Sequence, residues 1–326
     1  MAILATEKIL TLDYWKPASK IQPGDYVFDK DGKLVKVKLV QTIMAQSCYE
    51  VHFNDHLTVA GDSRLAFPIE TPRYRKRIHE YKGKRKFRRP LVRKEVEELQ
   101  TLPLKTKYNR LAYSVPTAKP LELPHQDLPV PPFVFGLTFC CIKRNKLYSI
   151  DKNYVEFVHE KLKSYGYQVI FNKHPEFFSV FPTITSQLAP NIPTKIPANY
   201  LLASSEQRIE LLRGILYAKR RQYSKAKDSF RVTNYNFQLI RQIQALVESL
   251  GHRTTLEFDN TKKYYTLYFK SRLKLMEHQV SPPVKVHFGR RYIKQIEPIP
   301  AQQCIHIETD GDDNSYLVGE GFIACR

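Results

Sequence analysis

The sequence lacks any apolar run long enough to cross a membrane. Its longest nearly apolar stretch, residues 133–142, is about half of the roughly 20 residues that a membrane-spanning helix needs. The N-terminus also lacks a basic segment followed by an apolar stretch, the pattern of a secretory signal. We therefore expect no membrane partner and a cytoplasmic location.

Cysteines are few, and acidic residues are scarce relative to basic ones. The five cysteines are scattered without a CxxC pair, which argues against a disulfide framework and a zinc ribbon. His52 and His56 would share a strand face, but two histidines without a third ligand are more often solvated. We therefore expect no metal site. Subtracting 32 acidic from 52 basic side chains leaves a net charge of +20, which favours a polyanionic partner, with nucleic acid as the first candidate.

The length of 326 residues predicts two domains, or one domain with a large insertion. Residues 1–72 and 283–326 contain short segments rich in β-branched and aromatic residues, so they predict β structure at both chain ends. The pair Asp31-Gly32 predicts a two-residue hairpin turn. Residues 73–130 comprise a basic tract and a Pro-rich linker, and residues 131–282 form a separate region.

The basic tract extends from Arg73 to Lys94. Twelve of its twenty-two residues are Lys or Arg and only Glu80 is acidic, so it contributes +11 of the net charge. Charge runs are commonly solvated loops, but aromatic residues interleaved here suit base stacking together with phosphate neutralisation. We predict nucleic-acid contacts from the following residues of the tract: Arg73, Arg75, Lys76, Arg77, Lys82, Lys84, Arg85, Lys86, Arg88 and Arg89.

The region 131–282 contains a diverged internal repeat. Each copy has an apolar or amphipathic leading segment (131–142; 208–220), a second helical pattern (151–166; 236–251) and two strands. In the second copy, apolar residues recur at helical spacing and predict a buried face, with Gly251 as the C-terminal cap. Gly136 and Gly214 take matching places in the leading helices, where close helix-to-helix approach would require glycine. The apolar residues are Phe237, Ile240, Ile243, Val247 and Leu250.

This organisation resembles an intein, a Hint splicing domain interrupted by a LAGLIDADG homing endonuclease. Residues 8–33 (KILTLDYWKPASKIQPGDYVFDKDGK) resemble the first splicing block, and residues 60–65 (AGDSRL) resemble the second. Residues 304–323 (CIHIETDGDDNSYLVGEGFI) resemble the closing blocks, and their sequence is close to that of inteins found in phage terminase large subunits. Residues 193–220 resemble the second LAGLIDADG helix. The resemblance implies an α+β fold, with an all-β Hint horseshoe formed by both chain ends and an inserted pseudo-twofold αββα repeat.

The resemblance also implies catalytic positions, and this sequence departs from the family pattern at them. Ala2 stands where the splicing nucleophile is a Cys or Ser, and a methyl group cannot attack a carbonyl. Ser63 stands where a His protonates the leaving amide. Cys325 and Arg326 take the places of the terminal His-Asn pair, while Cys304 occupies a position where the family often keeps an assisting Asp or Cys. We expect no splicing activity.

The endonuclease positions depart in the same way. A LAGLIDADG enzyme uses one acidic residue at the end of each leading helix to bind a divalent metal over the scissile phosphates. Cys141 and Lys219 stand at those positions, and a lysine ammonium repels Mg²⁺. No cofactor is expected, and Mg²⁺ would be needed only if nuclease activity survives. Lys219, Arg220 and Arg221 could instead neutralise phosphates.

The leading hypothesis is a free-standing, degenerate intein-like protein, not an enzyme, which binds DNA as a phage or mobile-element accessory protein in the host cytoplasm or virion. RNA remains an alternative to DNA. A second hypothesis is an active homing endonuclease whose metal ligands are displaced to Asp151 and Asp228. A third is a structural subunit that binds a protein of a phage or replication assembly.

Overall fold

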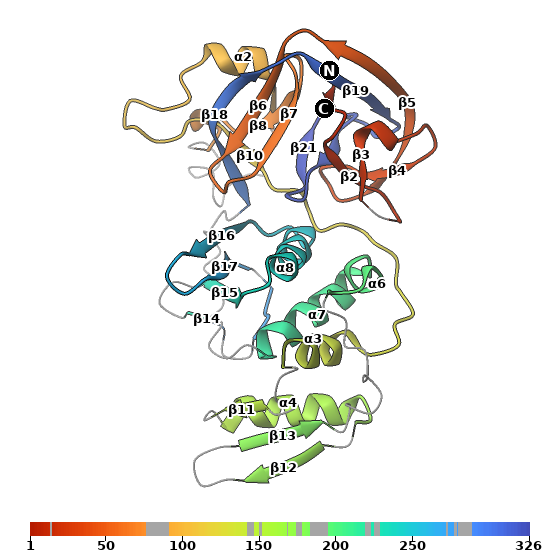
Figure 1. The fold of residues 1–326 in the computed structure, drawn as a ribbon, viewed down its shortest axis with the longest axis vertical. Coiled ribbons are helices and arrows are strands. Elements are labelled where there is room, and N and C mark those ends of the chain that lie inside the picture. Colours follow the sequence, from red (N-terminus) through yellow and green to blue (C-terminus); the bar gives the residue numbers. More distant parts are fainter. Residues whose placement is uncertain are drawn as a thin grey trace, which may run out of the picture. The chain divides into compact units, whose positions relative to one another are not determined.

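The structure is a computed structural model that divides into two compact units (Figure 1). Unit 1 comprises Met1–Glu122, Glu248–Leu256 and His287–Arg326, and unit 2 comprises Leu123–Val247 and Glu257–Val286. Among the described residues, no helix is long and apolar enough to span a membrane. The described residues are 1–13, 15–75, 91–141, 147–149, 152–167, 169–173, 178–182, 195–218, 223–224, 229–271, 273–276, 279 and 289–326.

The largest sheet of unit 1 is antiparallel and combines strands from both chain ends. Its order is β10 (Ser114–Pro116), β18 (Arg290–Ile299), β6 (Cys48–Phe53), β7 (Thr58–Asp62), β1 (Ile3–Leu4), β19 (Gln302–Thr309), β5 (Leu34–Ala45) and β4 (Tyr26–Phe28). Register shifts interrupt the β18–β6 and β19–β5 ladders. Such irregularities bend strands, so the sheet is curled, and the mixed α+β class is confirmed.

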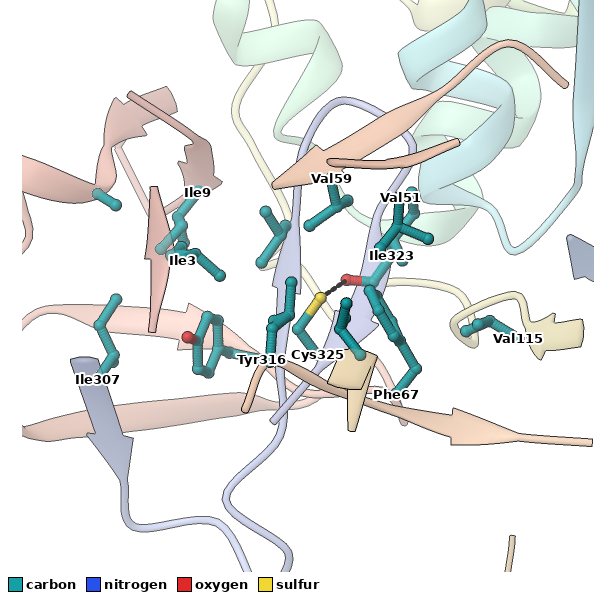
Figure 2. Close-up of a cluster of buried hydrophobic side chains, with 14 of the residues drawn as sticks. Ile3, Ile9, Val51, Val59, Phe67, Val115, Ile307, Tyr316, Ile323 and Cys325 are labelled. Atoms are coloured by element: carbon teal, nitrogen blue, oxygen red, sulfur yellow. Dashed lines mark hydrogen bonds between the residues drawn. The ribbon is translucent and has the colours of Figure 1, made fainter. Parts of the chain in front are cut away.

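Two smaller sheets complete the β structure of unit 1. One has the order β21 (Ile323–Cys325), β20 (Tyr316–Val318), β2 (Lys8–Leu10) and β3 (Trp15–Pro17), and the other pairs β8 (Ala66–Ile69) with β9 (Val92–Glu95). A short helix, α2 (Val96–Thr101), follows β9, and a 3-10 turn, η1 (Ala18–Lys20), follows β3. Buried residues of all three sheets meet in one hydrophobic core, part of which is drawn in Figure 2.

The hairpin predicted at Asp31-Gly32 is present, but its turn is longer than two residues. Phe28 pairs with Leu34, so residues 29–33 form the connection between β4 and β5. The Asp29 carboxylate accepts hydrogen bonds from the N–H groups of Asp31 and Lys33, at 2.9 and 2.8 Å. This side-chain acceptor stabilises the wider turn, because Asp bonded to its own following backbone mimics a backbone turn.

Residues 123–286 contain the four predicted helices, the short helix Ala198–Leu201, which was not predicted, and strands of which the repeat pattern predicted only some. The helices are α3 (Pro132–Cys141), α4 (Lys152–Ser164), α6 (Ala198–Leu201), α7 (Ser205–Ala218) and α8 (Phe237–Ser249). One sheet has the order β11 (Leu147–Ser149), β13 (Phe178–Pro182) and β12 (Val169–Lys173). The other is β14 (Tyr223–Ser224), β15 (Ser229–Asn234), β17 (Tyr264–Phe269) and β16 (Thr254–Asp259). β11, β14 and β15 are the strands missing from the sequence prediction. Within this range, the segment Glu248–Leu256, with the end of α8 and the start of β16, belongs to unit 1, and the rest belongs to unit 2.

The leading helices α3 and α7 approach closely at their glycines, as the sequence predicted. A Cβ on Gly136 would overlap the carbonyl oxygen of Leu211, and a Cβ on Gly214 would overlap that of Phe133. The two backbones are therefore in direct contact at this crossing, and only glycine fits there.

The prediction for α8 holds except at its first residue. Ile240, Ile243 and Val247 are fully buried, and Gly251 follows the helix with a φ of +80°, in the left-handed cap conformation. The prediction that Phe237 belongs to the core is wrong, because this first helical residue is 49% exposed and its ring packs on Tyr265.

Candidate functional site

The N-terminal segment of unit 1 lies between β7 and β19, beside the positions predicted from the splicing resemblance. Asp62 accepts a hydrogen bond from the Ala2 N–H at 2.8 Å and donates its own N–H to the Ala2 carbonyl at 2.9 Å. The Asp62 carboxylate is also 3.6 Å from the Met1 nitrogen. Ser63 follows Asp62 directly, and its N–H bonds to the Ser47 carbonyl. The structure thus places Ala2 close to Ser63, because the buried Asp62 that binds Ala2 directly precedes Ser63 in the chain.

Cys304 lies in β19 on the other side of β1 and faces a small apolar cluster. Its sulfur is 3.9 Å from the sulfur of Cys48, and both residues are buried. Burial raises the pKa of Cys304 to about 12, with further contributions from the neighbouring Cys48 and Asp62. The thiolate is the reactive form of cysteine, so this thiol is inert at neutral pH. The cluster consists of Ala2, Leu4, Ala45, Cys48, Ala60 and Cys304.

Cys325 is the last residue of β21, and Arg326 follows that strand directly. Cys325 is completely buried in the hydrophobic core between the labelled Tyr316 and Phe67, and its thiol donates to the Ile323 carbonyl at 3.6 Å (Figure 2). Burial raises the pKa of Cys325 well above its ordinary value. Arg326 exchanges two backbone hydrogen bonds with Ala66, at 3.0 and 3.2 Å. These contacts give both residues a structural role.

Glu7 is an ionisable group beside this site that the sequence analysis missed. Its carboxylate accepts the Ala60 N–H at 2.8 Å. Burial raises the pKa of Glu7 to about 7, the hydrogen bond from Ala60 opposes the shift, and the charge of Glu50 adds to it. Glu7 therefore titrates near neutral pH. Glu7 lies in the connection between β1 and β2, and its contact with Ala60 joins residues 53 positions apart, so no local sequence pattern indicates its burial.

The endonuclease positions lie largely outside the described residues. Cys141 is the last residue of α3, but its side chain is not described. Lys219, Arg220 and Arg221 are outside the described residues, as are Asp151 and Asp228. By residue type, a thiol and an ammonium do not fit a magnesium site, since Mg²⁺ is bound by carboxylates. The predicted phosphate contacts at 219–221 remain predictions.

The described part of the basic tract consists of its two ends, and they differ in environment. Arg73 is exposed. The Arg75 guanidinium donates to the carbonyls of Glu70 and Ala112 at 2.7 Å each, and lies over the Tyr292 ring at 5.2 Å. These hydrogen bonds stabilise the fold. They also occupy N–H donors of Arg75 that could otherwise bind a phosphate. The other predicted contacts fall outside the described residues: Lys76, Arg77, Lys82, Lys84, Arg85, Lys86, Arg88 and Arg89.

An exposed loop at residues 106–110 adds cations and an aromatic ring beside the start of the tract. The Thr106 N–H bonds to the Arg110 carbonyl, so the loop is tight, and Tyr108 at its tip is 72% exposed. The Lys107 ammonium lies 5.0 Å from the Tyr108 ring centroid. The loop borders a hollow of about 630 Å³, lined by Pro72, Arg75, Thr106, Lys107, Tyr108, Arg110, Leu111 and Tyr292. The sequence analysis missed this loop, although the alternation KTKYNR at residues 105–110, with cations around a tyrosine, could have indicated it.

His52 and His56 do not share a strand face. His52 lies in β6, which ends at Phe53, whereas His56 is exposed in the following turn with a φ of +67°. The prediction of a common face was wrong because the turn begins earlier than the sequence pattern indicated.

Sequence comparisons find one curated relative at a modest level of identity, and no protein-family model matches the chain. The chain is 25% identical over 348 aligned residues to the replicative DNA helicase DnaB of Mycobacterium intracellulare. The alignment covers 95% of this chain and 55% of the helicase, so the chain spans about half the length of this relative.

Structure comparisons find intein and homing-endonuclease neighbours. The MchDnaB-1 intein is 24% identical, with 21% of this chain and 54% of that chain covered and a TM-score of 0.21. The gp41-1 intein is 18% identical, with 34% and 73% covered and a TM-score of 0.23. The homing endonuclease I-DmoI, in complex with DNA and Mn, is 14% identical, with 48% and 97% covered and a TM-score of 0.31. The resemblance to phage terminase inteins remains a prediction.

Proposed function

We propose that this chain is an intein-like DNA-binding protein that does not splice. The observation that carries DNA binding is the exposed Tyr108, flanked by Lys107 and Arg110, beside the start of a tract with twelve cations in twenty-two residues. Aromatic faces stack on bases, and cations neutralise the phosphates between them. The sequence similarity to a replicative DNA helicase, which covers 95% of the chain, also supports a nucleic-acid partner.

The absence of splicing activity is proposed from the chemistry of the described site. Ala2 has no nucleophilic atom, and the neighbouring Cys304 thiol has a pKa of about 12. The Cys325 thiol is buried and is engaged with a backbone carbonyl. A Ser hydroxyl at position 63 is a poor general acid, because its pKa is far above neutral. No step of an acyl transfer has a competent group among these residues.

DNA binding is tested by gel-shift measurements with mixed-sequence duplexes across a salt series. We expect affinity to fall steeply with salt, because each phosphate contact releases counterions and contributes about −0.9 to the slope of log K against log salt. Replacing Lys84, Arg85 and Lys86 by Gln should weaken binding and reduce that slope by up to about 3. With single-stranded DNA in the same assay, Tyr108→Ala should weaken binding by about 1–3 kcal/mol with little change in slope, because it removes only stacking on unpaired bases.

A matched control removes the same charge elsewhere in unit 1. Lys33, Lys36 and Lys38 are exposed on the β4–β5 hairpin, and their replacement by Gln also removes three positive charges. If this control weakens binding as much as the tract variant, the tract is not the contact. Affinity for a protein partner that persists at high salt would favour a structural subunit instead.

The same duplexes, incubated with Mg²⁺, test the nuclease alternative. We expect no cleavage. Cleavage that is lost in Asp151→Asn or Asp228→Asn would show that displaced carboxylates bind the metal, and it would overturn the inactive assignment.

A further inference from the structure

Three side chains with metal-ligating atoms meet on one face of the large sheet of unit 1. Glu50 and His52 are two residues apart in β6, so they project from the same face of the strand. Glu297 in β18 pairs directly with Glu50. The His52 Nε2 atom is 3.0 Å from Glu50 Oε2 and 3.2 Å from Glu297 Oε2, and the three ligand atoms all lie within 4.8 Å of one another.

The backbone that carries this group is fixed by the core. Val51 and Phe53 alternate with the two ligating residues of β6 and are buried on the opposite face. The β18–β6 ladder continues from Gln295 to Ile299 without interruption. The three side chains are therefore held on two paired strands whose register cannot slip without exposing the core.

The contacts of His52 are not those of an ordinary hydrogen-bonded histidine. Its Nε2 atom is inaccessible to solvent and makes no hydrogen bond of acceptable geometry among the described residues, although two carboxylate oxygens are close. A buried polar atom without a hydrogen bond is costly. A cation placed between the three groups would satisfy the nitrogen lone pair and both oxygens at once.

The other oxygen of Glu297 is already engaged. Gln295 donates a side-chain hydrogen bond to Glu297 Oε1, which leaves Oε2 facing His52. Hydrogen bonds of this kind orient ligating carboxylates in metal sites. The donor set of one imidazole nitrogen and two carboxylate oxygens suits zinc-class divalent cations.

We propose that Glu50, His52 and Glu297 bind one divalent cation of the zinc class. Tetrahedral zinc, with bonds of about 2.0–2.1 Å, places its ligand atoms about 3.3 Å apart, close to the separations observed from His52. Two carboxylates balance the 2+ charge, and the fourth position is left for water. The cation would link β6 to β18, two strands nearly 250 residues apart in the sequence. This site is independent of the proposed DNA contact.

The test uses the full chain, stripped with a chelator and dialysed. Calorimetric titration with ZnCl₂ should give a site that is lost in His52→Ala and weakened at least about tenfold in Glu297→Gln. Titration with Co²⁺ should give the visible bands of tetrahedral cobalt without the near-ultraviolet absorption of thiolate ligands. Glu297→Gln keeps the shape of the side chain, so circular dichroism and melting curves should confirm that this variant folds.

His56→Asn serves as the matched control. It removes an exposed imidazole from the same hairpin, and Asn tolerates the positive φ at that position. The control should bind zinc as the parent chain does. Unchanged zinc stoichiometry and affinity in both His52→Ala and Glu297→Gln, or cobalt spectra with thiolate bands, would overturn the proposal.

Discussion

At the scale of single residues, several positions that the splicing resemblance singles out are buried packing positions in this structure. Ala2, Ala60 and Cys304 share one small buried cluster, and Cys325 lies in the main core. Small apolar groups pack efficiently between strands, whereas catalytic groups need polar partners and access to substrate. Glu7, whose pKa is raised to about 7, lies beside this site at a position that the resemblance did not single out.

The raised pKa of Glu7 predicts a stability that depends on pH. The folded chain binds this proton more tightly than the unfolded chain, whose carboxyl titrates near pH 4.5. The contribution is fully present below pH 4.5, and it is lost as the pH rises through about 7. The loss is at most about 3 kcal/mol. Glu7→Gln should abolish this part of the dependence and raise the stability at pH 8 relative to the parent.

Urea unfolding at pH 5, 6, 7 and 8 measures this effect. Gln keeps an acceptor for the Ala60 N–H, so the fold should be preserved. Glu122→Gln is a control, because this carboxylate is exposed and also lies in unit 1. A parent and a Glu7→Gln variant with the same stability profile over this range would contradict the assignment.

At the scale of elements, the crossing of α3 and α7 depends on two glycines. Gly136→Ala would insert a methyl group against the Leu211 carbonyl, and this backbone cannot move aside as a flexible side chain could. Overpacking of this kind typically costs 1–3 kcal/mol. We expect Gly136→Ala to lower the stability of unit 2 by about that amount, as measured by hydrogen exchange of the α3 and α7 amides.

A comparison with Gly24→Ala separates contact from backbone strain. Gly24 has a φ of +98° and nothing within 4 Å of an added Cβ, so Ala there costs only backbone strain, about 1–3 kcal/mol, in unit 1. If the hydrogen-exchange protection of the α3 and α7 amides falls equally in both variants, the effect of Gly136→Ala is not local to the helix crossing.

Elements with strong local signals could be predicted from the sequence, and those set by distant partners could not. The helical period and Gly251 located α8, and the glycines of the leading segments indicated their close approach. β11 has only three residues and β14 only two, too short for a periodicity to be visible. Phe237 fits the helical period but is 49% exposed and packs on Tyr265, because a helical period does not show whether other elements cover the first residue of a helix.

At the scale of the whole molecule, the candidate sites depend on pairings between distant segments. The Glu50–His52–Glu297 group requires the β18–β6 register, and the Ala2–Asp62 contacts require β1 to lie beside β7. No local pattern encodes such a register, so the sequence identified the residues Ala2 and His52 without their partners. The segment Glu248–Leu256 is a further case, because it packs in unit 1 although it falls within the repeat of residues 131–282.

Buried ion pairs connect that segment to the rest of unit 1. The Arg291 guanidinium lies 2.8 Å from Asp55 and 3.1 Å from Glu248, and all three side chains are at most 2% exposed. Arg253 also approaches Asp55, at 3.3 Å. Charges so far from water are tolerated only when they are paired.

Arg291→Ala should therefore destabilise unit 1 strongly. It leaves the Glu248 and Asp55 carboxylates buried with fewer compensating charges, and breaking such a pair typically costs 3–5 kcal/mol. Arg93→Ala removes an exposed arginine whose partner Glu95 is also exposed, so it should change the stability by less than about 1 kcal/mol. Denaturant unfolding would measure the stability of both variants, and hydrogen exchange of residues 248–256 would measure the protection of that segment. Because Arg291 pairs with both Asp55 and Glu248, a loss of protection confined to the 248–256 segment would mean that the ion pairs hold that segment without supporting the sheet.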